Sequence, residues 1–117
     1  MTRIRITIPG GELTATLENN AAAKDFLALL PMTLTLEDYS KTEKISDLPK
    51  RLATTGSADG HDPEIGDITY YAPWGNLAIF YKDFGYSRGL IKLGEIESDV
   101  SPLIISGPFE ATFERVH

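Results

Sequence analysis

Hydrophobic and polar residues alternate over several short stretches of the chain, the pattern typical of half-buried β-strands. Isoleucine occupies positions 4, 6 and 8, and leucine or alanine occupies positions 13, 15 and 17. A Pro-Gly-Gly turn at residues 9–11 separates the two stretches, and glycine tolerates the backbone angles that such turns need. The first seventeen residues therefore predict a β-hairpin.

One segment changes to helical spacing. Asn20 is of a residue type that caps helix N-termini, and Pro31 disfavours helix at the residue before it. Between them, apolar residues recur at the i, i+3, i+4 and i+7 positions of one helical face. These positions are Ala23, Phe26, Leu27 and Leu30. We expect a helix of about three turns here.

The rest of the chain alternates strand patterns with polar segments. Further strands are predicted over residues 33–39, 67–71, 76–81, 90–96 and from Phe109 onward. The connecting segments are predicted to be a loop at 40–44, a short helical turn at 46–49, a long surface loop at 54–66 and a short helix at 98–105. Seven or eight short strands with one main helix favour a closed β-barrel, which leaves no long edge exposed.

Composition excludes several classes of function. The net charge of −6 argues against nucleic-acid binding and against attraction to anionic membranes. The chain has no cysteine, which excludes disulfides and thiolate chemistry. No stretch approaches the ~18 apolar residues of a membrane span, and the N-terminus alternates as a strand does rather than as a signal peptide. We expect a cytoplasmic protein.

The aromatic residues carry a resemblance to a known family. Seven of the eleven lie between Tyr70 and Tyr86. Two consecutive segments resemble small prokaryotic cyclophilin-like proteins: DITYYAPWGNLAIFY at 67–81 and DFGYSRGLIKLGEI at 83–96. The resemblance extends over nearly the whole chain. It implies a single cyclophilin-like domain over residues 1–117, with an eight-stranded barrel capped by helices.

The same resemblance bears on activity. True cyclophilins use an arginine, on the strand after the first helix, to hydrogen-bond the prolyl amide over an apolar pocket. The matching stretch at 32–39 has no arginine and carries Glu37 and Asp38, although Arg51 or Arg88 could reach such a pocket from elsewhere. The sequence therefore favours a binding module for a peptide or small ligand without isomerase activity. A weak peptidyl-prolyl isomerase and a structural or assembly protein are the alternatives, and no catalytic residue is identified.

Five residues are the candidates for ligand binding. Three of them are Tyr81, Tyr86 and Arg88, and two of these flank a glycine turn, where a ligand can approach the backbone closely. Glu37 and Tyr39 share the polar side of the predicted strand at 33–39. A carboxylate beside a pocket can act as an acid or base when burial raises its pKa. A solvated strand end is nevertheless the favoured interpretation of Glu37 and Tyr39.

Most of the other aromatic residues have a structural interpretation. Leu77, Ile79 and Tyr81 alternate as barrel-filling residues do, and Trp74 and Phe84 are expected to cover turns. A ligand groove lined by aromatic residues is the alternative, because aromatic walls with polar groups suit concave sites.

An acidic loop raises the question of a metal. Its candidate ligands are Asp59, His61, Asp62, Glu64 and Asp67. Their spacing matches neither a calcium loop nor a paired-histidine zinc motif, so a hydrated acidic loop is expected, with no metal or other cofactor. Hydrolase and nucleotide-binding motifs are also missing from the sequence.

Overall fold

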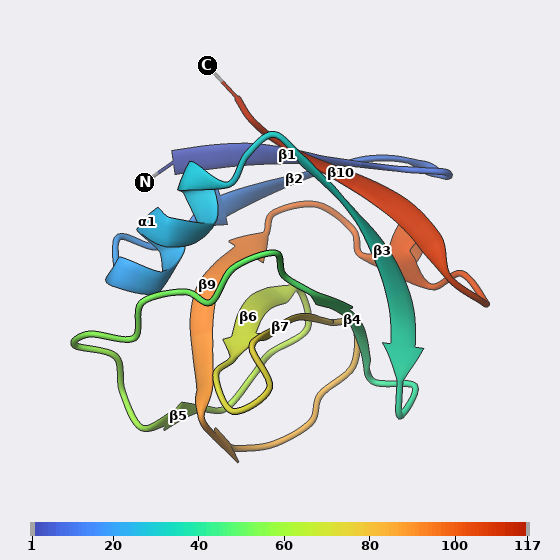
Figure 1. The fold of residues 1–117 in the computed structure, drawn as a ribbon. Helices are drawn as coiled ribbons and strands as arrows, with labels where there is room; N and C mark the ends of the chain where they lie inside the picture. The colour runs from blue at the N-terminus through green and yellow to red at the C-terminus, as the bar shows by residue number, and fades with distance from the viewer. Residues whose placement is uncertain (1, 117) are drawn as a thin grey trace.

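A computed structural model describes residues 2–116 and contains a closed antiparallel barrel (Figure 1). In chain order the elements are β1 (Thr2–Ile8), β2 (Gly11–Leu17), α1 (Ala21–Ala28), β3 (Met32–Tyr39), β4 (Glu43–Asp47), β5 (Gly60–His61), β6 (Asp67–Tyr71), β7 (Asn76–Phe80), β8 (Ser87–Arg88), β9 (Leu90–Ile96), the 3₁₀ turn η1 (Ser101–Leu103) and β10 (Phe109–Arg115). Around the barrel the order is β1-β10-β3-β4-β7-β6-β9-β2, and β5 pairs with β8 outside it. The expected mostly-β closed barrel with one helix is confirmed.

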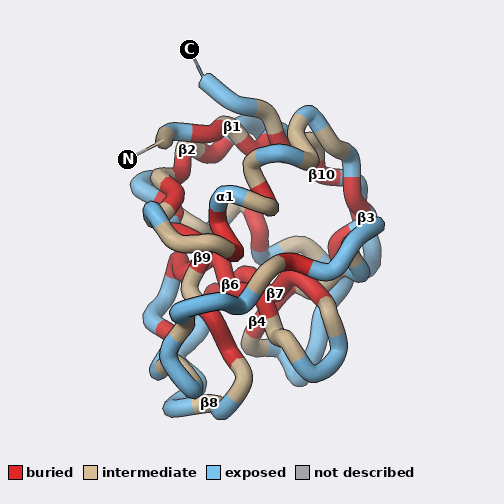
Figure 2. The backbone as a smooth tube through the Cα atoms, turned by 60° about the vertical axis from the view of Figure 1, so that its left-hand side comes forward, coloured by how far each residue is buried: buried red, intermediate tan, exposed pale blue. Residues whose placement is uncertain are grey.

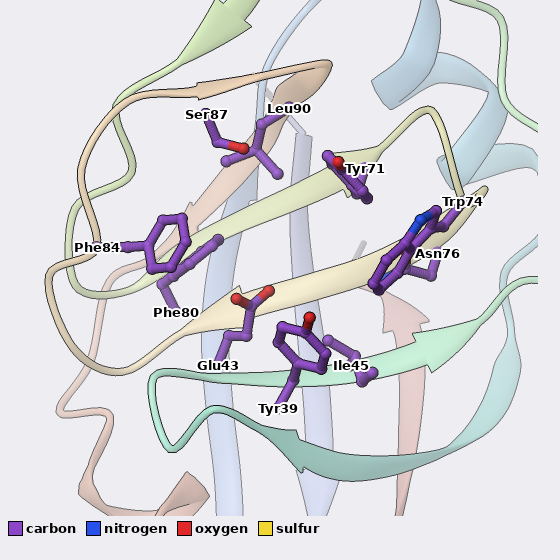
Figure 3. Close-up of a pocket in the computed structure, with 10 residues that line it drawn as sticks. All are labelled: Tyr39, Glu43, Ile45, Tyr71, Trp74, Asn76, Phe80, Phe84, Ser87 and Leu90. Atoms are coloured by element: carbon purple, nitrogen blue, oxygen red, sulfur yellow. The ribbon is translucent and has the colours of Figure 1, made fainter.

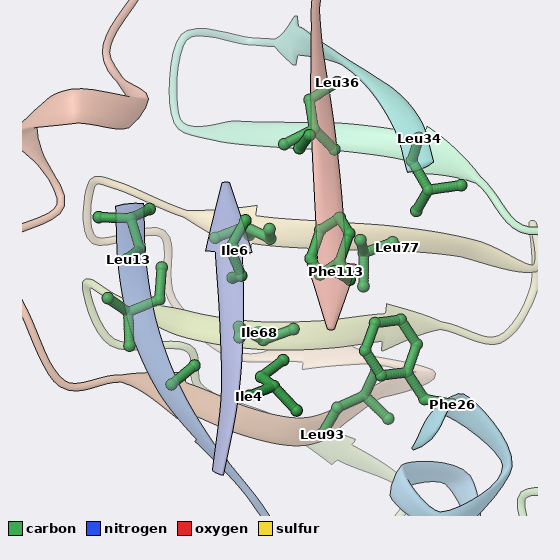
Figure 4. Packing of buried hydrophobic residues seen from close by; sticks show 14 of the residues in the cluster. Ile4, Ile6, Leu13, Phe26, Leu34, Leu36, Ile68, Leu77, Leu93 and Phe113 are labelled. Carbon is green, nitrogen blue, oxygen red and sulfur yellow. The ribbon is translucent and has the colours of Figure 1, made fainter. Parts of the chain in front are cut away.

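The barrel interior is filled by the alternating hydrophobic positions found in the sequence. Ile6 of β1 pairs with Leu13 of β2 and with Phe113 of β10, and all three side chains point into the core (Figure 4). Buried backbone follows the barrel strands, whereas the loops around them are exposed (Figure 2). Eight strands enclose a space that side chains alone can fill. In this barrel the buried hydrophobic residues fill it.

Helix α1 is capped as predicted but is shorter than predicted. The Asn20 Oδ1 atom accepts a hydrogen bond of 2.8 Å from the Ala23 amide. The helix ends at Ala28, because the amides of Leu29 and Leu30 bond to carbonyls only three residues back. That tighter last turn leads the chain out of the helix ahead of Pro31, where the α conformation is disfavoured. Phe26 reaches the core and meets Phe113 edge to face, with ring centroids 5.8 Å apart.

The segment after β3 was predicted wrongly. Residues 40–44 are not all loop and residues 46–49 form no helical turn, because Glu43–Asp47 is strand β4, paired with β3 and β7. A tight turn closed by the Thr42 amide on the Tyr39 carbonyl (3.2 Å) joins β3 to β4. It holds Ser40 and Lys41 at a φ of 54°, conformations for which glycine or asparagine is the usual signal. The short helix predicted at 98–105 is likewise reduced to the three-residue turn η1.

Asn20 joins α1 to the barrel as well as capping it, which gives a testable expectation. Its Nδ2 atom donates to the Lys92 carbonyl of β9 at 3.0 Å. We expect Asn20→Ala to lower the free energy of unfolding by about 1–2 kcal/mol, because both hydrogen bonds are lost. Urea denaturation measures the change. Asn19→Ala, at an exposed neighbouring position, is the control, and equal losses in the two variants would contradict the capping role.

No helix within residues 2–116 is long and apolar enough to cross a lipid bilayer.

Candidate functional site

A cavity of about 160 Å³ lies on the outer face of the barrel, over β3, β4, β7 and β6. Strand alternation builds it: Glu43 and Ile45 of β4 face outward, whereas Lys44 between them faces the interior. The turn after β6 and the loop after β7 complete its walls. We call it the aromatic cavity, lined by Tyr39, Glu43, Ile45, Tyr71, Trp74, Asn76, Phe80, Phe84, Ser87 and Leu90 (Figure 3).

The walls are five aromatic rings in two groups. Trp74 lies edge to face against Tyr39, with centroids 5.7 Å apart, and against Tyr71, with centroids 5.3 Å apart. Phe80 and Phe84 form a tilted pair with centroids 5.8 Å apart. Trp74 is 59% exposed and Phe84 is 50% exposed, although rings of this size are usually more fully buried. The rim of the cavity is therefore apolar and accessible from solvent.

A carboxyl group lies among these rings. Glu43 is placed by strand pairing between Tyr39 of β3 and Phe80 of β7, and its carboxyl group points into the space that the rings enclose (Figure 3). Glu43 is only 8% exposed. Its carboxyl group forms no hydrogen bond or salt bridge with any side chain of residues 2–116. Burial raises the pKa of Glu43 to about 7. The group can therefore exchange a proton near neutral pH.

Asn76 supplies a second polar group without a complete set of partners. It pairs with Tyr71 of β6 and Asp47 of β4 and is 4% exposed. Its Nδ2 atom donates to the Leu77 carbonyl at 3.1 Å. Its Oδ1 atom is buried and accepts no hydrogen bond from the described residues, which is rare for a buried oxygen.

A different polar network lies at the inner side of the same strands. Lys44 is fully buried, and its Nζ atom donates to the Ile105 carbonyl at 2.7 Å and lies 3.0 Å from Asp38 Oδ1. The Tyr81 hydroxyl donates to the same Asp38 oxygen at 2.6 Å. Burial, reinforced by this bond to Asp38, raises the pKa of Tyr81 to about 12, and the bond lowers the pKa of Asp38. These groups satisfy one another, so the network stabilises the barrel end.

The structure brings one of the five sequence-predicted site residues to the aromatic cavity, Tyr39. Glu37 is on the same outer face of β3 but lies outside the cavity lining. Tyr81 belongs to the inner network. Tyr86 is 63% exposed and packs over Gly60, and Arg88 is exposed in β8, which pairs with β5. A ligand-binding role for these residues stays a prediction.

The sequence patterns did not identify the polar residues of the cavity, Glu43 and Asn76. Glu43 fell in a segment that was predicted to be a loop. Trp74 and Phe84 were expected to cover turns, and they also form the rim. The signal that points to Glu43 is its alternation with Ile45. Once β4 is recognised as a strand, these two residues pair with Tyr39 and Glu37 and lie on the same outward face.

The acidic loop is anchored by contacts to the Asp67 carboxylate. His61 Nε2 lies 2.8 Å from Asp67 Oδ2, which also accepts the Glu64 amide at 3.0 Å. Lys92 Nζ lies 3.6 Å from the other oxygen of Asp67. Within residues 2–116 no three histidine or acidic side chains come together as metal ligands.

A closed eight-stranded antiparallel barrel with one helix packed beside it is the architecture expected of a cyclophilin-like protein. The sequence model of the Cyclophilin-like family matches residues 6–114, and the chain belongs to this family.

Comparison with solved structures gives the same fold. A hypothetical protein from Archaeoglobus fulgidus, known from its solution structure, superimposes with a TM-score of 0.71 at 16% sequence identity. The match covers 98% of this chain and 95% of the archaeal one. No curated protein matches the sequence. Similarity at this level concerns the fold, and a fold by itself assigns no function.

Proposed function

We propose that the protein is a binding module that holds a small ligand, or one side chain of a peptide, in the aromatic cavity. The observation that carries this proposal is the combination of exposed rings with two buried polar groups that lack partners. Trp74 and Phe84 keep apolar surface in water, the Asn76 Oδ1 atom is buried without a partner, and the Glu43 carboxyl has no partner among residues 2–116. Both features cost free energy that a bound ligand would recover.

The size of the cavity sets the size of the ligand group. An engineered protein cavity of about 150 Å³ with apolar walls binds benzene. The aromatic cavity, at about 160 Å³, accommodates a group of similar size. A ring or a short branched chain would fit, and a larger ligand would extend over the exposed rim.

Binding without isomerisation fits the lining residues better than isomerase activity does. Polarising a prolyl amide needs a hydrogen-bond donor above the apolar surface, the role that the resemblance assigns to arginine. None of the ten lining residues, all within the described part of the chain, is arginine. The Arg51 guanidinium instead donates to the Ala72 carbonyl at 2.9 Å.

A ligand titration followed by NMR tests the proposal. Trp74 is the single tryptophan, so its indole N–H gives one unambiguous signal. We expect that signal and the Glu43 and Asn76 amides to shift with at least one of indole, cyclohexanol, benzyl alcohol, benzylammonium, benzoate or a short Xaa-Pro peptide. A coupled proline-peptide assay on the same sample is expected to give only the uncatalysed rate.

Two matched variants separate this cavity from other apolar surface. Trp74→Ala removes the exposed ring of the rim, and Ile104→Ala removes an exposed apolar side chain outside it. We expect the first to weaken binding and the second to leave it unchanged. Equal affinity in Trp74→Ala and the native protein, or no shift with any of the six probes, would refute binding in this cavity.

A further inference from the structure

The polar groups of the aromatic cavity define which ligand chemistry it can accept, an inference that rests on the proposed binding function. Asn76 Oδ1 is an acceptor without a donor, because the Nδ2 end of the amide is already bonded to Leu77. Glu43 offers two further oxygens with no partner among residues 2–116. A ligand group that pairs with the Glu43 oxygens must carry a hydrogen-bond donor.

The charge of the surroundings decides between neutral and cationic donors. The lining residues include no lysine, arginine or histidine, so the ionised Glu43 has no counter-ion in the cavity. Five aromatic rings surround it, and the face of an aromatic ring attracts cations and repels anions. Lys44, the adjacent residue, points to the opposite face of β4, where Asp38 and Ile105 hold its ammonium group. A protonated nitrogen would meet both needs, and an anion would meet neither.

We propose that the aromatic cavity binds a small organic cation with N–H donors, a primary ammonium or guanidinium group on a benzene-sized or smaller body. In this arrangement the cationic nitrogen pairs with the Glu43 carboxylate. The rings of Tyr39, Trp74 and Phe84 pack against the body and the charge. The same group can belong to a free amine or to a lysine or arginine side chain of a peptide.

The proposal implies proton release on binding. A cation favours the ionised carboxylate, whereas burial in the free protein keeps part of the Glu43 population protonated near neutral pH, since its pKa is raised to about 7. The other titratable residues of the lining are Tyr39 and Tyr71, and Tyr81, after β7, also interacts with Glu43. Glu43 is the only carboxylic acid in the lining. Affinity should therefore rise with pH through the titration of this one carboxyl group.

Isothermal titration calorimetry with three isosteric probes tests the ligand class. The probes are benzylammonium, benzyl alcohol and benzoate, which differ in charge at nearly constant size. We expect benzylammonium to bind at least about tenfold more tightly than benzyl alcohol, and benzoate not to bind. Between pH 8 and pH 6 the affinity for benzylammonium should fall about tenfold, as the ionised fraction of a group with a pKa of about 7 does. Near pH 6, the binding enthalpy should differ between two buffers of different ionisation enthalpy. That difference gives the number of protons released on binding.

Variants connect the preference to Glu43. Glu43→Gln keeps the shape of the side chain and removes its charge, so it should abolish the preference for the cation and the pH dependence. Glu110→Gln removes an exposed carboxylate of β10 and should leave both unchanged.

The outcomes separate this inference from the proposed function. If benzyl alcohol and benzylammonium shift the Trp74 indole signal with equal affinity, the cation preference is overturned and the binding function remains intact. An affinity for benzylammonium that Glu43→Gln does not change would also overturn the cation preference. A failure of every probe in the NMR titration would remove the proposed function itself. Binding of a short lysine- or arginine-containing peptide in place of benzylammonium would identify a peptide as the source of the cation.

Discussion

Gly94→Ala is expected to lower the free energy of unfolding by about 3 kcal/mol, because a β-carbon at this position has no space. Gly94 lies in β9 opposite Leu17 of β2, where the barrel closes. An added β-carbon would overlap the Thr16 carbonyl oxygen and lie 2.9 Å from Leu17 Cα. Both are backbone atoms, so the strand itself would have to move. Only three residue pairs join β2 to β9, and displacement of one endangers the closure.

Chemical denaturation measures the loss, and amide hydrogen exchange locates it. We expect faster exchange in β2 and β9 than in the β4–β7 pair. Gly10→Ala is the control, since a β-carbon at Gly10 meets no atom within 4 Å. Unfolding free energies within about 0.5 kcal/mol of each other in the two variants would show that the β2–β9 contact tolerates the extra atom.

The second large effect is the dependence of stability on pH that Glu43 creates. Its pKa is about 7 in the folded protein, against 4.5 for the ordinary carboxyl group. The folded state therefore binds the proton more tightly than the unfolded state. As a result, the contribution of Glu43 to the free energy of unfolding falls as the pH rises from about 4.5 to about 7, and is constant above that. The shift of about 2.5 units (7 − 4.5) corresponds to about 3 kcal/mol.

Glu43→Gln should remove this dependence. We expect the variant to be more stable than the native protein above pH 7, by up to about 3 kcal/mol, and the difference to vanish below about pH 4.5. Urea denaturation at a series of pH values gives both curves. Glu110→Gln, whose exposed carboxyl stays in water, should leave the slope of the native curve unchanged. A Glu43→Gln variant that is less stable than the native protein at pH 8 would contradict a strained, partnerless carboxylate.

The sequence predicted the barrel because its strands carry a clear hydrophobic period. β9 was predicted at its observed limits, and the hairpin of β1 and β2 and the cap at Asn20 were also found. The wrongly predicted elements are those whose local sequence preference differs from the structure that tertiary contacts impose. β4 has the sequence Glu-Lys-Ile-Ser-Asp, which has a weak strand propensity by itself, and it becomes a strand through pairing with β3 and β7.

The candidate site was not predicted from the sequence, because β4 was not predicted as a strand. Tyr39 was identified because its own strand alternates clearly. Glu43 could be recognised only after β4 was aligned beside Tyr39 and Phe80, which are far apart in the chain. The missing partner of Asn76 Oδ1 likewise arises from packing and has no local signal. A site made by the outer faces of several strands thus depends on register, which single-sequence patterns constrain poorly.

Strand β4 places two opposite charges on opposite sides of the barrel wall, with the Glu43 carboxyl outside and the Lys44 ammonium inside. A slip of β4 by one residue would exchange them. The carboxylate would then face Asp38 and the Ile105 carbonyl, two acceptors that now hold an ammonium group, and repulsion would replace attraction. The adjacent opposite charges of Glu43 and Lys44 therefore favour one register of β4. The few hydrophobic residues of this strand would not fix its register by themselves. The charge of Glu43 thus also helps to exclude a misaligned barrel.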